Sequence, residues 1–224
     1  MSACEVPSRS ERFGYTCHRC GHCCRDNRIQ LNPYEVARLA RNQATTTSKF
    51  REQWTVDGAG TALRQTDAGA CVFLGSEGCS VHADRPLACR LYPLGRHVAS
   101  DGREWFSRIH PHPQSTGELS EGGTIAQFLL EQGAAPFLRA ADDYYFWYCR
   151  VQSLVIEQAV AIDGESTADT ASLSQPWVDM DAAIADYCES HSLAAPQELE
   201  ARKELHLQIL ERLYEISSKE QIRA

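Results

Sequence analysis

Two groups of cysteines constrain what this chain can fold into more than any other feature of the sequence. The first group lies in the segment CHRCGHCCR at residues 17–25, and the second is spread over residues 71–89. Thiols at this density indicate disulfides, a metal ion or an iron–sulfur cluster, and each of these requires the chain to bring distant sulfurs together. The two groups hold Cys17, Cys20, Cys23, Cys24, Cys71, Cys79 and Cys89.

Disulfides are the least favoured of the three explanations. Cys23 and Cys24 are neighbours, and adjacent Cα atoms lie about 3.8 Å apart, whereas disulfides usually need about 4.4–6.8 Å. The first 15 residues contain no apolar stretch that could serve as a secretory signal, and no run of eighteen apolar residues exists. We therefore expect a cytoplasmic protein, without a membrane span, whose thiols are reduced.

The distribution of charge bears on the partners of the chain. Residues 9–108 hold 15 Lys and Arg against 10 Asp and Glu, whereas residues 109–224 hold 7 against 19. A nucleic-acid-binding surface needs a much stronger basic bias than this. We expect neither nucleic acid nor a membrane as a partner. A protein, such as a redox partner, is the partner that the acidic half could contact.

Zinc and an iron–sulfur cluster both remain open from the spacing alone. Two overlapping C-x2-C units can each supply two corners of a tetrahedral zinc site. The triplet Cys17, Cys20 and Cys23, completed by one distant cysteine from residues 71–89, also matches the ligands of a [4Fe–4S] cluster. In that case Cys24 points away from its neighbour and either serves a second site or lies around the first centre without ligating it. Two closed tetrahedral sites need an eighth ligand, for which a histidine such as His110 or His112 is available.

The pattern of apolar residues divides the chain into a turn-rich front and a helical back. Asn32 and Pro33 predict a helix start, with Glu35 in its first turn, and Ser48 is expected to cap a short helix ending at Trp54. Hairpins are expected over 61–81 and 90–109. Helices are expected from 124 and over 136–162, 177–193 and 196–222, with a polar loop at 163–176.

These elements predict an α+β fold: a small metal-organised region of short helices and hairpins packed on a mainly α-helical C-terminal half. We expect a flexible N-terminal tail over residues 1–14, which includes Cys4, a cysteine-cluster metal-binding domain over 15–130 and a helical C-terminal extension over 131–224. Cys149 and Cys188 fall in apolar helical stretches, where a free cysteine packs as a small hydrophobe. The aromatic residues at 144–148 are expected in the core or at an interface.

The segment CHRCGHCCR, the helix with Glu35 and the later segment with Cys71, the DRPLACRLYP run and Cys89 resemble the CxxCxxCC cysteine-cluster family. That family is described as a putative zinc- or iron-chelating domain, and bacterial flagellin lysine N-methylases carry a related one. The resemblance covers roughly residues 15–130 and implies a metal centre, an iron–sulfur cluster or zinc, held by all seven cysteines. Relatives carry a further cysteine after the second hairpin, where this chain has His110, which we take as the candidate eighth ligand.

Arginines near the cysteines are the candidate cofactor-binding residues. Arg25, Arg85 and Arg90 could offset the negative charge that several thiolates leave on a metal centre, or bind an anion. Surface ion pairs with Asp26 or Asp84 would be an ordinary alternative, and His82 and His97 are expected at the surface.

The sequence therefore predicts a metal-binding cysteine-cluster protein. The first hypothesis is a [4Fe–4S]-type centre for electron transfer or cluster-assisted chemistry, with methyl transfer as an analogy to the flagellin methylases. The alternative is a zinc-stabilised interaction module without catalysis. No nucleotide-binding loop, catalytic triad or carboxylate pair independently identifies an enzyme.

Overall fold

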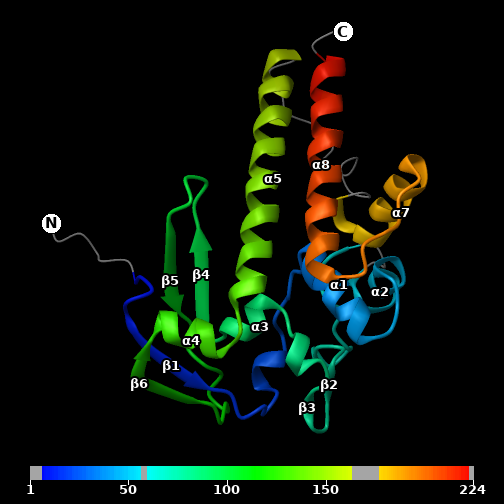
Figure 1. Cartoon of the computed structure of the whole chain (residues 1–224). Helices are drawn as coiled ribbons and strands as arrows, with labels where there is room; N and C mark the ends of the chain where they lie inside the picture. The colour runs from blue at the N-terminus through cyan, green and yellow to red at the C-terminus, as the bar shows by residue number, and fades with distance from the viewer. Residues whose placement is uncertain (1–6, 57–59, 163–176, 222–224) are drawn as a thin grey trace, which may run out of the picture.

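The computed structural model describes residues 7–56, 60–162 and 177–221, including the side chains of these residues except those of 153–162 and 216–221. Figure 1 shows an α+β arrangement in which two long helices rise from a body of short helices and strand pairs. The predicted fold class is confirmed. The helices are α1 (Pro33–Asn42), α2 (Thr47–Trp54), α3 (Leu87–Leu91), α4 (Ile125–Glu131), α5 (Ala135–Ile162), α7 (Met180–His191) and α8 (Leu199–Gln221).

The described strands form three antiparallel pairs. Strand β1 (Arg12–Thr16) pairs with β6 (Glu118–Thr124), β2 (Leu74–Gly75) with β3 (Gly78–Cys79), and β4 (Leu94–Val98) with β5 (Glu104–Arg108). The β2–β3 and β4–β5 pairs are the two predicted hairpins. The β1–β6 pair joins segments about a hundred residues apart.

Helix α1 begins where the sequence predicted. The side chain of Asn32 accepts a hydrogen bond from the backbone N–H of Glu35, and the Glu35 carboxylate accepts one from the N–H of Asn32. This capping box satisfies two N–H groups that a helix start leaves unpaired. Helix α2 is capped by Thr46 and not by Ser48, because the Thr46 hydroxyl is the one that accepts from the backbone N–H of Lys49.

The expectation of a flexible tail over residues 1–14 is corrected for the part that the structure describes. Residues 12–14 belong to strand β1, and the Phe13 side chain is 1% exposed. Its ring meets Phe128 of α4 edge-to-face, with centroids 4.9 Å apart. The burial of this ring and the pairing of β1 with β6 both hold the segment on the fold. Cys4 lies outside the described residues, as does the expected loop at 163–176.

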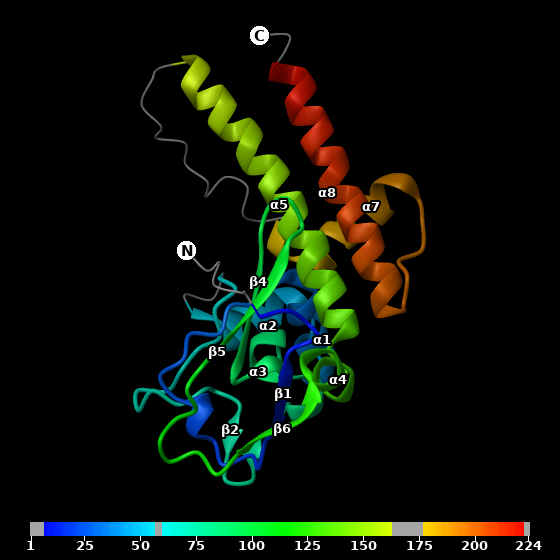
Figure 2. The ribbon, with the colours of Figure 1, turned by 90° about the vertical axis from the view of Figure 1, so that its left-hand side faces the viewer.

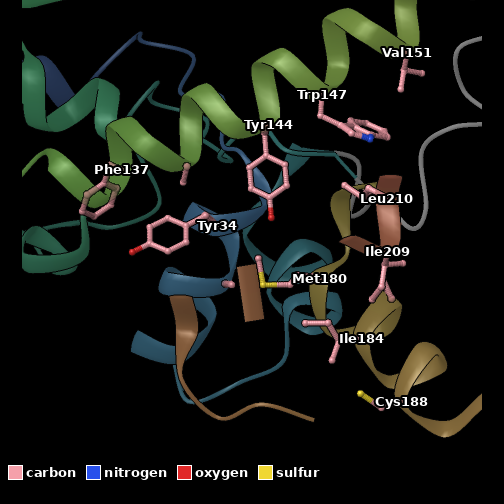
Figure 3. Packing of buried hydrophobic residues seen from close by; sticks show 13 residues of the cluster. Tyr34, Phe137, Tyr144, Trp147, Val151, Met180, Ile184, Cys188, Ile209 and Leu210 are labelled. Atoms are coloured by element: carbon pink, nitrogen blue, oxygen red, sulfur yellow. The ribbon is translucent and has the colours of Figure 1, made fainter. Parts of the chain in front are cut away.

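The largest group of buried apolar side chains connects α1 to the C-terminal helices. Tyr34 of α1 packs with Phe137 and Tyr144 of α5, and Met180 and Leu210 come from α7 and α8 (Figure 3). Cys188 belongs to this cluster, as predicted, whereas Cys149 is half-buried beside Tyr145.

Two further clusters lie around β1, α3 and α4 and around α1, α2 and the β2–β3 hairpin. Helices α5 and α8 run alongside each other in Figure 1, and Figure 2 shows them farther apart at their upper ends than near the body. Among the described helices, none combines the length and the apolar character needed to cross a membrane.

Candidate metal centre

The first cysteine loop follows strand β1 directly and is tightly turned. Gly21 has a φ of 79°, and a Cβ atom there would lie 2.9 Å from a methyl carbon of Leu74. Both features favour glycine at this position. The backbone N–H of Cys24 donates to the carbonyl of Gly21 and closes the single turn His22–Cys24. The sequence therefore compresses Cys20, Cys23 and Cys24 into little more than one turn.

The second cysteine group meets this loop through backbone hydrogen bonds. The N–H of Cys71 donates to the carbonyl of Cys24 over 2.8 Å, and Arg25 and Ala70 form an antiparallel bridge. Cys79 lies in β3, and Cys89 lies in α3, the short helix that follows. Residues separated by about fifty positions in the sequence are thus adjacent in the fold.

Six of the seven predicted cysteines line one cavity of about 190 Å³. The cavity is bounded on its other sides by apolar side chains such as Phe73 and Val81 and by Arg19, Arg28 and Arg85. The structure therefore supports the prediction that the two cysteine segments converge. Their thiols line the walls of one cavity. The lining cysteines are Cys17, Cys23, Cys24, Cys71, Cys79 and Cys89.

Cys20 is the predicted cysteine that the structure does not bring into this cavity. Its Sγ lies 3.9 Å from the Ser115 hydroxyl, in the segment between β5 and β6. Burial raises the pKa of the Cys20 thiol, but hydrogen bonds from His22 and Thr116 outweigh it and lower that pKa overall. The Cys20 thiol therefore loses its proton more readily than an ordinary cysteine, and it lies at a separate surface hollow with Arg19 and Arg25.

The cavity thiols are mostly held in their neutral form. A hydrogen bond from the Cys24 thiol lowers the pKa of Cys23 to about 7, and the same interaction, with burial, raises the pKa of Cys24. Burial, followed by the charges of Cys71 and Cys79, raises the pKa of Cys89. Thiolates packed this closely repel one another, and a bound cation would remove that repulsion.

Sulfur donors in a largely apolar cavity fit a soft metal centre. Thiolates select zinc, copper(I) and iron–sulfur clusters over hard cations such as Mg²⁺. Among the residues that the structure describes, no three His, Cys, Asp or Glu side chains converge closely enough to hold one metal ion.

The predicted histidine ligand is exposed. His110 follows Ile109, which lines the cavity, but His110 itself does not. His112 stacks on His22 with ring centroids 5.0 Å apart, next to the Cys20 side of the loop. The assignment of His110 as eighth ligand stays a prediction.

The three candidate arginines occupy different places. Arg85 lines the cavity, whereas Arg25 lies with Arg19 and Cys20 at a neighbouring surface hollow. Arg90 is 7% exposed, and it donates to the carbonyls of Gln132, at 2.6 Å, and Ala83. Its guanidinium also lies 4.1 Å from the centre of the Phe137 ring. Arg90 therefore ties the second cysteine segment to α5.

His82 is the site residue that sequence reasoning missed, because we expected it at the surface. It lies in the single turn His82–Asp84, three residues after Cys79, and lines the cysteine cavity. The sequence spacing was the available signal, because a side chain about one turn beyond a candidate ligand can lie on the same side of the chain.

Comparison with known proteins agrees with this site. Residues 16–109 match the model of the CxxCxxCC family, described as "Putative zinc- or iron-chelating domain". The predicted resemblance is confirmed over this segment, which contains all seven cysteines of the two groups, and the match supports metal binding without distinguishing iron from zinc. Neither the curated proteins nor the solved structures contain a match.

Proposed function

We propose that the cysteine cavity holds an iron–sulfur centre of the [4Fe–4S] type and that the protein uses it for electron transfer or cluster-assisted chemistry. The observation that carries this proposal is the arrangement of six thiols, from two distant segments, around one cavity of about 190 Å³. Each thiolate of a cubane ligates a different iron, so its ligands stand around a volume instead of meeting at one ion. When bound, such a centre supplies one-electron redox chemistry.

The residues around the cavity have distinct roles in this proposal. The 17–24 loop and the 71–89 segment supply the thiolates. The guanidinium groups of Arg19 and Arg85 lie close enough to Cys79 to oppose the rise in its pKa that burial causes, so they favour its thiolate. Arg25 lies farther from the thiols, at the neighbouring surface hollow, and its positive charge would act on the centre only through longer-range electrostatics. The apolar side chains, including Phe73 and Val81, limit access of water to the site.

Metal content and colour test the proposal. Protein reconstituted anaerobically with iron and sulfide is expected to be brown, with broad absorbance near about 400 nm and about four irons per chain. Colourless protein that takes no iron under these conditions and holds stoichiometric zinc would contradict it. That result would support the alternative, a zinc-stabilised interaction module in which the metal contributes folding free energy.

A serine substitution at Cys20 tests the ligand set. Of the six cavity thiols, a [4Fe–4S] centre uses four, because each ligates a different iron, and we take Cys23 and Cys79 to be among them. The family resemblance instead implies seven ligands. We expect Cys20→Ser to keep the iron content and absorbance of the wild type, because its thiol lies beside Ser115 and outside the cavity. Loss of iron in this variant would instead add Cys20 to the ligands.

A further inference from the structure

His82 presents an unused hydrogen-bonding group at the cysteine cavity. Its side chain lines the cavity together with Cys79 and Cys89. Within the part of the chain that the structure describes, the Nε2 atom of His82 has no hydrogen-bond partner and almost no solvent-accessible surface. A buried polar atom without a partner is costly, and it calls for a group that completes it.

The surroundings of the other ring nitrogen determine what Nε2 can do. The Nη1 atom of Arg85 lies 3.3 Å from Nδ1 of His82 and also donates to the His82 carbonyl over 2.6 Å. A guanidinium has only donors, so Nδ1 must accept. The proton of the neutral imidazole is therefore on Nε2, and this nitrogen is a donor.

The same geometry argues against His82 as a metal ligand. A ligating histidine uses the lone pair of one nitrogen and donates from the other to a carboxylate, a carbonyl or water. Here the second nitrogen faces the guanidinium of Arg85, which has only donors and cannot accept a hydrogen bond. Burial, followed by the charges of Arg85, Arg19 and Arg90, also lowers the pKa of His82, in agreement with a neutral ring.

We propose that the Nε2–H of His82 donates a hydrogen bond to a metal-bound sulfur of the centre and tunes its reduction potential, with Arg85 as the positioning residue that fixes the ring. This inference rests on the proposed metal centre and names a residue that acts on it. Hydrogen bonds to the sulfurs of an iron–sulfur centre stabilise the more negative, reduced state. Loss of the donor should therefore lower the reduction potential without removing metal.

Three variants test the inference on reconstituted full-length protein. His82→Leu removes the donor, and His82→Gln keeps an amide N–H at similar reach. His97→Leu is the matched control, because His97 is exposed, stacks on Trp105 and has a polar partner in Ser107. Iron per chain and the midpoint potential are measured for each. We expect wild-type iron content in all three, a lower potential in His82→Leu, a smaller shift in His82→Gln and none in the control.

Two results would overturn the inference, and both differ from failure of the proposed function. Loss of iron in a folded His82→Gln variant would make His82 a ligand, and an unchanged potential in His82→Leu would show that Nε2 contacts no bound sulfur. If the wild type takes only zinc, the proposed function fails and the readout becomes the rate of zinc transfer to a chelator. Faster transfer from His82→Leu at equal zinc content then supports the hydrogen bond, and equal rates refute it.

Discussion

At the scale of single residues, charged groups buried near the cysteines hold the cavity walls in place. The Glu35 carboxylate is 4% exposed and accepts hydrogen bonds from the backbone N–H groups of Asn32 and Leu87, at 2.9 and 2.6 Å. It thereby joins the start of α1 to the start of α3, the helix that carries Cys89. The sequence predicted its role at the helix start but not the bond to Leu87.

Replacement of Glu35 by glutamine should change how stability depends on pH. Burial raises the pKa of Glu35 above its ordinary value of 4.5, so above that pH the folded chain keeps a proton that the unfolded chain has lost. The stability that this adds is complete below about pH 4.5 and is lost as the pH rises through the folded-state pKa. Urea unfolding of both proteins between pH 4 and about 8 should show a steeper loss of stability with rising pH in the wild type than in Glu35→Gln. Parallel profiles would contradict it.

Arg90→Ala should destabilise the protein through the contacts of its guanidinium. The substitution leaves the carbonyls of Ala83 and Gln132 without this donor and removes the cation from the face of Phe137. We expect a loss of about 2–4 kcal/mol in the free energy of unfolding. Arg64→Ala, at an exposed position, is the control. Equal stability of the two variants in chemical denaturation would show that Arg90 does not connect the two halves.

At the scale of elements, the β1–β6 pair places the first cysteine loop. Strand β1 ends at Thr16, one residue before Cys17, so the pairing of Thr16 with Glu118 fixes where the loop begins. The anchor of the strand is Phe13, which packs on Phe128. The position of the first cysteine loop therefore depends on strand β6, which lies about a hundred residues later in the sequence.

Phe13→Ala should cost roughly 3–5 kcal/mol of stability, because it removes a buried aromatic ring and leaves a cavity. Thermal unfolding of the metal-free protein measures this directly. Tyr148→Ala, which removes an aromatic side chain that is 37% exposed, should cost much less. A melting temperature for Phe13→Ala equal to that of the wild type would mean that residues 12–16 are not part of the fold.

Local signals explain which elements could be predicted. Asn32, Pro33 and Glu35 form a complete helix start within four residues. The turn sequence SDG at 100–102 predicts the β4–β5 hairpin. Strand β6 carries no such signal, because its sequence ELSEGGT is polar and rich in glycine and its residues are mostly exposed. Phe13 was missed for a related reason: its partner Phe128 is more than a hundred positions away, and no pattern within residues 1–14 reveals it.

In the candidate site, too, some features could be predicted from the sequence and others could not. The cysteine spacing predicted that two distant segments meet, and the cavity supports this. It could not predict that Cys20 lies beside Ser115, because the loop conformation at Arg19 and Gly21, both with positive φ, decides on which side that side chain lies. Nor could it predict that His82 lines the same cavity as the thiols.

At the scale of the whole molecule, metal binding should be coupled to protonation and to folding. The pKa values of Cys24, Cys71, Cys79 and Cys89 are raised, with burial a cause for each. These thiols therefore hold protons at neutral pH, and ligation must release them. The metal affinity should rise with pH, and loading should raise the melting temperature. Calorimetric titration in buffers of different ionisation enthalpy measures the released protons; binding without proton release would contradict this coupling.

The central claim is that thiols from two distant segments hold one centre, and the iron content of single-serine variants tests it most directly. Cys23→Ser and Cys79→Ser, one from each segment, are reconstituted beside Cys149→Ser, whose thiol lies on α5 outside the cavity. The account predicts that both cavity variants lose iron and the absorbance near about 400 nm together, whereas Cys149→Ser keeps both. Full iron in either cavity variant, or equal loss in Cys149→Ser, would contradict it.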